Sequence, residues 1–324
     1  MAKLKALGCA LAAVLLATST GTAFAAANQT YVSKRSGNDG NTANNCNIIQ
    51  PCLTIAAALS VTNAGGSLQL VDGRFDESFT ISTALTISAI DGAYIVGNGL
   101  SPVITVAAGA GDRVAIRNTV VAGGPTSVAG VQFTSGKSLT ISGSRIQGAS
   151  GTGINFVPSS PASGQTQLFL NDTQVVQSNG GNITIRPTAD MNVGVRLVNV
   201  LTRNSGTWGL KLDGSGMTTA GNITADVVES IMSNNDTNGI IVTSDTGQGN
   251  VRLMIDHSHT IHNQAFGLVA VGAQSFVFVN KSTASFNQTG IGQLSGSIVA
   301  SYQNNAVNFN TTQTSGTITS VPLR

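Results

Sequence analysis

Three charged residues lie in two strand-like segments whose spacing predicts that they are neighbours. Arg186 follows the apolar segment NITI, and Lys211 and Asp213 lie in the later segment GLKLD. When these segments are aligned on their apolar residues, Arg186 and Asp213 take the same outward position on successive strands, and Lys211 points to the same side. Such a group binds the carboxylate of an acidic sugar, or it is an exposed ion pair that contributes little stability.

A second group of candidates lies in the segment DHSHTIHN, which holds all three histidines of the chain. On a continuous strand His257 and His259 share a face, and with Asp256, or with Glu229 of the preceding repeat, they hold a metal or supply a general base. A turn between the two histidines removes this geometry and leaves a solvated turn. The residues that we consider for catalysis are Arg186, Asp213, Glu229 and His257, and those for a metal are Asp256, His257 and His259.

The single tryptophan, Trp208, lies in the turn SGTWGL shortly before Lys211. An exposed tryptophan stacks on a sugar ring, whereas a buried one fills the end of a coil. Trp208 and Lys211 are therefore the candidates for ligand binding.

A repeat must position these residues. A short apolar strand that follows Gly or Asn recurs at intervals of 23, 29, 27, 30, 28 and 23 residues, beginning at Val131, Ile154, Ile183, Leu210, Ile240, Leu268 and Ile291. Periods of this length are typical of a solenoid. Two or three strand-length runs occur in each period, and this predicts an all-β parallel β-helix.

The alternation of residues along each strand predicts what faces inward. One inward column contains Ile154, Ile183, Leu210, Ile240 and Leu268, and a second contains Phe156, Ile185, Leu212, Val242 and Ala270. Asparagines recur at one turn and predict a hydrogen-bonded ladder of Asn179, Asn204, Asn234 or Asn235, Asn263 and Asn287. A β-sandwich is the alternative, but its strands would not recur at this spacing.

The segment before the repeats predicts a cap. Cys46 and Cys52 enclose a short loop, and in an oxidising compartment a disulfide is expected, the alternative being two unrelated thiols. The run PCLTIAAAL predicts a short apolar helix over Leu53 to Leu59, opened by Pro51. A solenoid exposes its core at its ends unless something covers it, so this helix is expected to cap the first coil.

The segment from Tyr31 to Phe75, YVSKRSGNDGNTANNCNIIQPCLTIAAALSVTNAGGSLQLVDGRF, resembles the capping segment of a group of bacterial secreted right-handed β-helix proteins. These belong to the pectate-lyase-like superfold. The resemblance continues through SLTISGSRIQGASGTGINFV to SGSIVASYQNNAVNFNTT and implies that the helix is right-handed. The group has no established activity, while the superfold includes lyases, hydrolases, epimerases, adhesins and phage spikes. The resemblance therefore implies a polysaccharide partner without a reaction.

The sequence lacks the catalytic sets of polysaccharide-cleaving enzymes. A hydrolase needs two carboxyl groups across the glycosidic bond, and a lyase needs a base together with Arg, Lys or calcium. The chain has two glutamates, Glu77 and Glu229, and none of the NTD, DD, GHG and RIK segments of polygalacturonase-like enzymes. This argues against a classical pectin hydrolase. No cofactor is expected, except calcium if the chain is a lyase.

The first residues predict export. A basic start with Lys3 and Lys5, an apolar run, and small residues around Ala25 are typical of a signal peptide over residues 1–25. Its removal takes two of the sixteen basic residues and leaves fourteen basic against fourteen acidic residues. Without a basic stripe, and with 5% aromatic residues, nucleic acid is not an expected partner. No other stretch is long enough to span a bilayer.

The sequence thus predicts an extracytoplasmic β-helix, with a cap and first coil over 26–79 and the remaining coils over 80–324. We expect a scaffold that binds polysaccharide or a cell-surface glycan, or mediates attachment, without catalysis. The alternatives are a polysaccharide lyase or glycoside hydrolase and a purely structural envelope protein. The sequence does not specify the oligomeric state.

Overall fold

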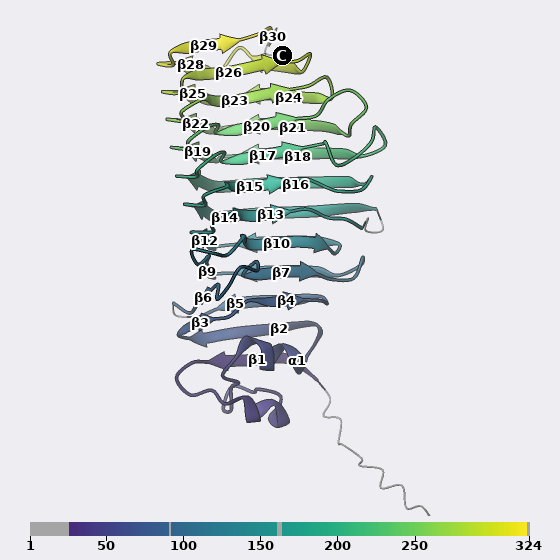
Figure 1. Cartoon of the computed structure of the whole chain (residues 1–324), viewed down its shortest axis with the longest axis vertical. Helices are drawn as coiled ribbons and strands as arrows, with labels where there is room; N and C mark the ends of the chain where they lie inside the picture. Colours follow the sequence, from purple (N-terminus) through teal and green to yellow (C-terminus); the bar gives the residue numbers. More distant parts are fainter. Residues whose placement is uncertain (1–25, 91, 161–163, 323–324) are drawn as a thin grey trace, which may run out of the picture.

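The computed structural model describes residues 26–90, 92–160 and 164–322. The predicted signal peptide, 1–25, lies outside this part of the chain. The described residues form a parallel β-solenoid in which successive coils stack along one axis (Figure 1). Each coil contributes one strand to a ten-stranded sheet and one or two strands to a twenty-stranded sheet. None of the described helices is long and apolar enough to cross a membrane.

The ten-stranded sheet runs the length of the stack, and every pairing in it is parallel. Its strands are β4 (Phe79–Ile81), β7 (Ile104–Ala107), β10 (Ala129–Ser135), β13 (Thr152–Phe156), β15 (Gly181–Ile185), β17 (Leu210–Asp213), β20 (Ile240–Thr243), β23 (Phe266–Val271), β26 (Thr289–Leu294) and β29 (Thr312–Ser315).

The twenty-stranded sheet forms the rest of the wall. Its strands are β1 (Ala27–Ser33), β2 (Thr62–Asp72), β3 (Arg74–Asp76), β5 (Leu85–Ala89), β6 (Tyr94–Val96), β8 (Arg113–Arg117), β9 (Val120–Ala122), β11 (Ser138–Ser142), β12 (Arg145–Gln147), β14 (Gln165–Val176), β16 (Asn192–Arg203), β18 (Asn222–Val228), β19 (Ile231–Ser233), β21 (Asn250–Asp256), β22 (His259–Ile261), β24 (Ser275–Asn280), β25 (Thr283–Ser285), β27 (Ile298–Tyr302), β28 (Ala306–Asn308) and β30 (Ile318–Val321).

This sheet bends at a corner where one residue per coil has left-handed backbone. The φ angle is 48° at Asp172, 52° at Asn199, 50° at Glu229 and 46° at His257. In β14 and β16 the corner lies within the strand, whereas in later coils it separates two strands, as His257 separates β21 from β22. A left-handed residue turns the chain sharply at this corner, which divides the larger sheet into two faces. Together with the ten-stranded sheet, each coil therefore has three faces.

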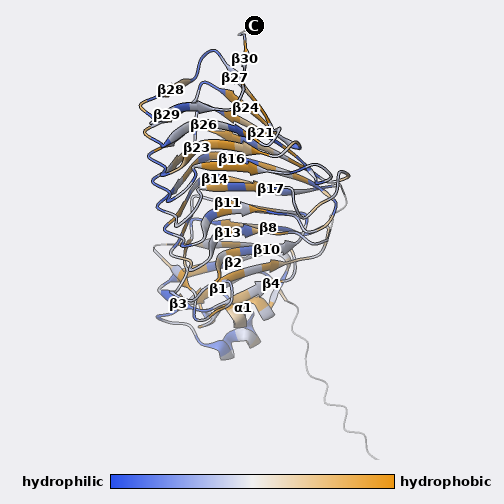
Figure 2. Cartoon of the chain, turned by 45° about the horizontal axis from the view of Figure 1, so that its top comes forward, coloured by the Kyte–Doolittle hydropathy of each residue, from blue (hydrophilic) through white to orange (hydrophobic). Residues whose placement is uncertain are grey.

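The two predicted inward columns are confirmed. Ile154 pairs with Ile183, Ile183 with Leu210, Leu210 with Ile240 and Ile240 with Leu268. The second column follows the same pairings two residues later, and members of both columns are buried. Figure 2 shows the apolar residues recurring along the strands of successive coils. The core is therefore one apolar column bounded by three walls.

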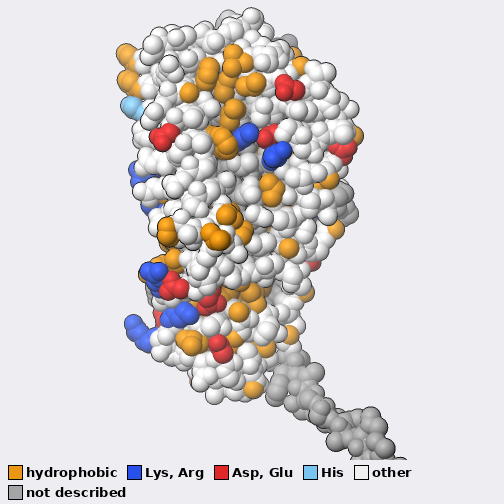
Figure 3. Space-filling model, viewed as in Figure 1, with side chains coloured by type: hydrophobic (Ala, Val, Ile, Leu, Met, Phe, Trp, Pro, Cys, Tyr) orange, Lys and Arg blue, Asp and Glu red, His pale blue; other side chains and the backbone are white. Residues whose placement is uncertain are grey.

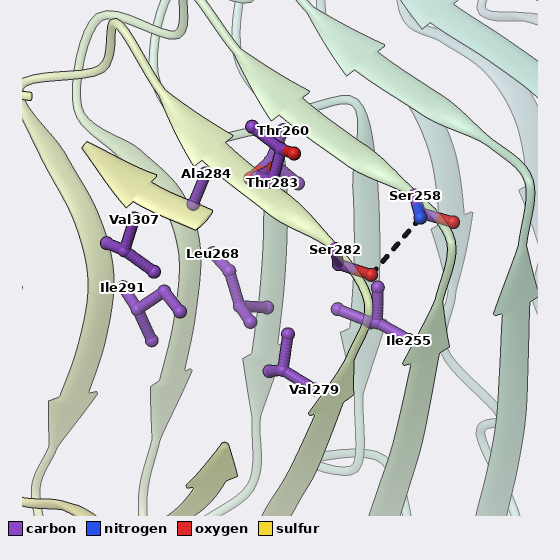
Figure 4. A pocket seen from close by; sticks show the side chains of 10 residues that line it. All are labelled: Ile255, Ser258, Thr260, Leu268, Val279, Ser282, Thr283, Ala284, Ile291 and Val307. Atoms are coloured by element: carbon purple, nitrogen blue, oxygen red, sulfur yellow. Dashed lines mark hydrogen bonds between the residues drawn. The ribbon is translucent and has the colours of Figure 1, made fainter. Parts of the chain in front are cut away.

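Two polar ladders line this core. At the corners of three successive coils an inward serine accepts a hydrogen bond from the preceding coil: Val200 N donates to Ser230 Oγ at 3.0 Å, Ser230 N to Ser258 Oγ at 3.1 Å, and Ser258 N to Ser282 Oγ at 3.1 Å. Figure 4 shows the last of these bonds beside a small cavity of about 10 Å³ in the core. A cavity of that size holds at most about one water molecule.

The asparagine ladder differs in part from the prediction. Asn235 N donates to Asn263 Oδ1 at 3.2 Å, and Asn263 N donates to Asn287 Oδ1 at 2.9 Å. In the earlier coils Ser205 stands at the ladder position, and the predicted Asn179 and Asn204 are exposed. The assignment of those two was wrong because asparagine also occurs beside the inward position. Asn204 is the left-handed residue before Ser205, a position that asparagine suits, and Asn179 follows the buried Ser178.

The helix and the disulfide lie at the N-terminal end, as the sequence predicts. Helix α1 (Ile55–Ser60) packs Ile55 and Ala58 into the core beneath β1 and β2 (Figure 1). It begins after Thr54, whose hydroxyl accepts from Ala57 N at 3.1 Å, and not at Pro51. A short 3₁₀ helix, η1 (Asp39–Asn44), precedes it.

Cys46 and Cys52 form a disulfide and are both buried. Their loop bonds to the outer edge of β1, since Cys52 N donates to Tyr31 O at 2.9 Å and Ser33 N donates to Cys52 O at 2.9 Å. The first edge of the sheet is thereby covered.

Candidate functional site

The predicted charged residues meet on the outer face of the ten-stranded sheet. Ile185 at the end of β15 pairs with Leu212 in β17, and this register places Arg186 beside Asp213. Lys211 Nζ lies 2.9 Å from Asp213 Oδ2, and Arg186 Nε lies 3.8 Å from the same oxygen. Figure 3 shows basic and acidic side chains gathered over this middle part of the face. We call Arg186, Lys211, Asp213 and Trp208 the charged cluster.

Asp213 is the buried centre of the charged cluster, with its side chain 7% exposed. Burial opposes ionisation of this carboxyl, but hydrogen bonds from Ser215 and Lys211 outweigh it, so its pKa is lowered. The backbone N of Ser215 donates to Oδ1 at 2.9 Å. An ionised carboxylate with a lowered pKa is neither a proton donor nor a strong base at neutral pH. The role that the geometry supports for Asp213 is therefore to hold the two cations.

Lys211 is positioned from two sides. Its Nζ lies 5.0 Å from the ring centroid of Trp208, in a cation–π contact, while it also bonds to Asp213. Trp208 Nε1 donates to Thr184 Oγ1 at 3.1 Å. The indole fills the space that a side chain at Gly181 would need. Trp208 is half-buried and anchors Lys211.

Arg186 is the cation of the cluster that solvent reaches most easily. Its side chain is 52% exposed, against 22% for Lys211. Its contact with Asp213 is made by Nε, at 3.8 Å from Oδ2. A guanidinium binds a carboxylate through two parallel hydrogen bonds. With two cations and one anion, the charged cluster carries a net charge of about +1 and favours an anion.

The histidine segment does not form one face. The chain turns at His257, so Asp256 ends β21 and His259 begins β22. His257 Nδ1 lies 2.9 Å from Asp256 Oδ2, and Asn280 Nδ2 donates to Asp256 Oδ1 at 2.7 Å. Glu229 occupies the same left-handed corner one coil earlier. Of the two geometries that the sequence allowed, the turn is present.

Burial opposes ionisation of Asp256, but hydrogen bonds from His257 and Asn280 lower the pKa of this carboxyl overall. In the described part of the chain no three His, Cys, Asp or Glu side chains gather in a group able to hold a metal ion. Asp256 and His257 therefore form a pair at the surface of one corner.

Sequence reasoning missed Thr184, Ser215 and Phe266. Thr184 in β15 pairs with Lys211 in β17, the next strand of the sheet. The alignment of the inward columns alone could have identified this neighbour. Ser215 lies in the turn after β17, where its backbone N donates to Asp213 and its side chain also lowers the pKa of that carboxyl. Phe266 has the same place in its coil as Trp208: it precedes a Gly-Leu pair, in AFGL as in TWGL.

Exposed aromatic rings also stack at another corner. The ring centroids of His262 and Phe286 are 4.9 Å apart, and those of Phe286 and Phe309 are 5.3 Å apart, with nearly parallel planes. Because the rings face one another, the middle ring presents only its edge to solvent. This geometry suits mutual packing better than stacking on a sugar.

The structure is similar to that of pectate lyase Pel9A, with a TM-score of 0.56 and 13% identity over 86% of this chain and 78% of that chain. It is also similar to the A-module of the mannuronan C-5 epimerase AlgE4 of Azotobacter vinelandii, with a TM-score of 0.50 and 11% identity over 80% of this chain and 87% of that chain. Neither a family model nor a curated protein matches the sequence. The fold is therefore the right-handed parallel β-helix of pectate-lyase-like proteins.

Proposed function

We propose that this protein is a secreted or surface β-helix scaffold that binds an acidic polysaccharide, or a cell-surface glycan of that chemistry, without cleaving it. The observation that carries the proposal is the charged cluster on the outer face of the ten-stranded sheet. Arg186 is exposed there, and Lys211 is held by Asp213 and Trp208. Two fixed cations beside an exposed sheet face suit carboxylate groups that recur along a glycan.

The polar residues beside the cluster support binding along the solenoid. The outward position that Lys211 occupies is filled in the three preceding coils by Gln132, Asn155 and Thr184. Strands lie about 4.8 Å apart, so these side chains offer hydrogen bonds at regular steps along the axis. The names of the two similar structures support a polysaccharide, since one is a pectate lyase and the other a mannuronan epimerase.

The chemistry of Asp213 supports binding over cleavage. A hydrolase needs a second carboxyl group across the scissile bond, and a lyase needs a base that takes a proton. In the described residues the ion pairs of the cluster involve one carboxylate, Asp213, and its pKa is lowered. A polysaccharide lyase or hydrolase that uses Arg186 or His257 is the rival proposal.

Two features support the proposed location outside the cytoplasm. The predicted signal peptide and the disulfide between Cys46 and Cys52 both fit an oxidising compartment. Mass spectrometry of the exported protein, before and after reduction, tests both the new N-terminus near Ala25 and the bridge.

The function is tested with pectate and mannuronan as probes. We expect the purified mature protein to retain one of them without releasing unsaturated products or reducing ends, with or without added calcium. Arg186→Ala and Lys211→Ala should weaken retention. Arg196→Ala is the matched control, because Arg196 is an exposed arginine on the outer face of β16 in the other sheet.

Two results would overturn the proposal. Turnover that disappears in Arg186→Ala or His257→Ala, with the circular dichroism spectrum unchanged, would establish an enzyme. Absence of binding and of turnover over a broad panel of acidic glycans would favour the structural role instead.

A further inference from the structure

The outer face of the ten-stranded sheet changes character immediately after Lys211. Up to that coil the middle outward position is polar, with Thr105, Gln132, Asn155, Thr184 and Lys211 in register. In the next three coils the same position holds Ile241, Val269 and Gly292. Figure 3 shows apolar side chains gathered above the charged group, toward the C-terminal end of the stack. The basic and apolar parts of the face therefore follow one another along the axis.

The apolar part is wider than one column. Two residues further along their strands, Val271 pairs with Leu294. We call Ile241, Val269, Val271, Leu294 and Phe266 the apolar half-face. Four of these side chains are half-buried and present part of their surface to solvent, whereas Val269 is 2% exposed.

Phe266 occupies the same turn position as Trp208, two coils later. The carbonyl oxygen of Trp208 accepts from Asn182 N at 2.9 Å, and that of Phe266 accepts from Gly239 N at 2.9 Å. Two coils correspond to about 10 Å along the axis. The two aromatic residues therefore bracket the boundary between Lys211 and Ile241.

Each of these aromatic rings lies over a glycine. A Cβ at Gly292 would lie 2.5 Å from Phe266 Cε1 and 3.1 Å from a methyl group of Val269. The ring thus lies down on the outer face instead of pointing into solvent, as the indole of Trp208 does over Gly181. A ring placed in this way extends the apolar surface on which a ligand can lie.

We propose that this face selects an acidic glycan that carries O-acyl groups. A carboxylate of the glycan binds Arg186 beside Lys211, and acyl methyl groups of the following sugar residues lie on the apolar half-face. Ile241 in β20 and the partly exposed Val271 in β23 lie one and two strands beyond β17, the strand of Lys211. These steps are about 5 and 10 Å, which is the scale of one and two sugar residues. The proposal rests on the proposed function and adds the substituent that the glycan must carry.

A second copy of the chain is a less suitable occupant. A stable protein interface buries about 800 Å² on each partner. The apolar half-face offers five side chains, of which one is already covered. It also borders two cations that an identical copy would bring close to its own. An anionic glycan with apolar substituents matches both the charge and the extent of the face.

The test uses mannuronan oligosaccharides before and after chemical O-acetylation, with affinity measured by titration calorimetry. We expect acetylation to tighten binding by about four-fold for each methyl group that becomes buried. Phe266→Ala and Ile241→Ser should remove this gain while leaving the affinity for the unmodified oligosaccharide. Phe278→Ala is the matched control, since Phe278 is 37% exposed in β24 on the other sheet, and it should keep the gain.

The outcomes separate the two proposals. If unmodified mannuronan binds through Arg186 and acetylation brings no gain, selection of acyl groups is refuted and the proposed function stands. If neither sample binds, the proposed function fails for this probe and this inference fails with it. A gain that survives both Phe266→Ala and Ile241→Ser also refutes the inference, because the acyl groups then bind elsewhere. If Phe266→Ala alters the circular dichroism spectrum, Ile241→Ser decides.

Discussion

Replacing Asp213 by asparagine separates binding from catalysis, because the two functions predict changes of opposite sign. In a binding site for acidic glycans, Asp213 holds the cations but repels the ligand. Asp213→Asn keeps the oxygen that accepts from Ser215 N, and it removes the negative charge together with the ion pair to Lys211. The affinity for mannuronan or pectate should therefore rise. If Asp213 takes part in bond cleavage, the same change abolishes turnover.

The expected gain follows from the geometry. Arg186 Nε lies 3.8 Å from Asp213 Oδ2, so a ligand carboxylate on the outer side of the guanidinium lies about 7 Å from that of Asp213. Two such charges repel by about 0.6 kcal/mol in bulk water and about 2 kcal/mol at the effective dielectric constant of a protein surface. Removing this repulsion tightens binding about three- to thirty-fold. Loss of the Lys211 bond lowers the free energy of unfolding by about 1–3 kcal/mol.

Titration calorimetry at low and at high salt measures this effect. The gain should shrink as salt rises, because screening weakens the repulsion between exposed charges. Asp226→Asn is the matched control: Asp226 is an exposed aspartate in β18 on the other sheet, and its replacement should leave affinity unchanged. A lower affinity in Asp213→Asn, with the fold retained, would refute the reasoning.

Three further results are expected. Asn263→Ala removes an acceptor shared by two buried donors of the preceding coil, so denaturation followed by circular dichroism should show that the unfolding free energy falls by about 2–6 kcal/mol. The control Gln264→Ala, at the neighbouring exposed residue, should change the unfolding free energy by less than about 0.5 kcal/mol. Equal effects of the two substitutions would contradict the ladder. Gly181→Ala displaces the indole of Trp208, so tryptophan emission should shift to longer wavelength, and an unchanged spectrum would argue against this packing. Because the pKa of Asp213 is lowered from 3.8, the stability difference between wild type and Asp213→Asn should be constant near neutral pH and shrink only as pH falls below about 3.8; a decline near neutrality would contradict the lowered pKa.

The inward columns could be predicted because alternation along a strand is a local property of the sequence. Ile183 and Leu210 fix the register of their coils, and that register also places Arg186 beside Asp213. Features one residue away from the strands were harder to predict. Asn204 was assigned to the ladder because asparagine suits both the left-handed position and the inward position that follows it, where Ser205 stands.

The parts of the site that escaped prediction depend on contacts between coils. Phe266 lies over Gly292, 26 positions later in the chain, and the absence of a side chain there gives no signal until the two coils are aligned. The start of α1 was misplaced for a related reason. Thr54 caps the helix, and the carboxylate of Glu77 accepts from Ile55 N at 2.9 Å, so a residue of the first coil stabilises the start of the helix.

The two ladders give the rod a direction. In both of them the backbone N–H of one coil donates to a side-chain oxygen of the coil that follows, as from Ser258 to Ser282 and from Asn287 to Asn310. Truncation from the C-terminal side therefore leaves buried N–H donors without acceptors. Removal of N-terminal coils leaves side-chain oxygens without donors. Buried N–H groups tolerate the loss of a partner less well than oxygens with two lone pairs. Removal of coils from the N-terminal side should thus destabilise the rod less than removal from the C-terminal side. A shortened rod needs replacement acceptors only at its C-terminal end.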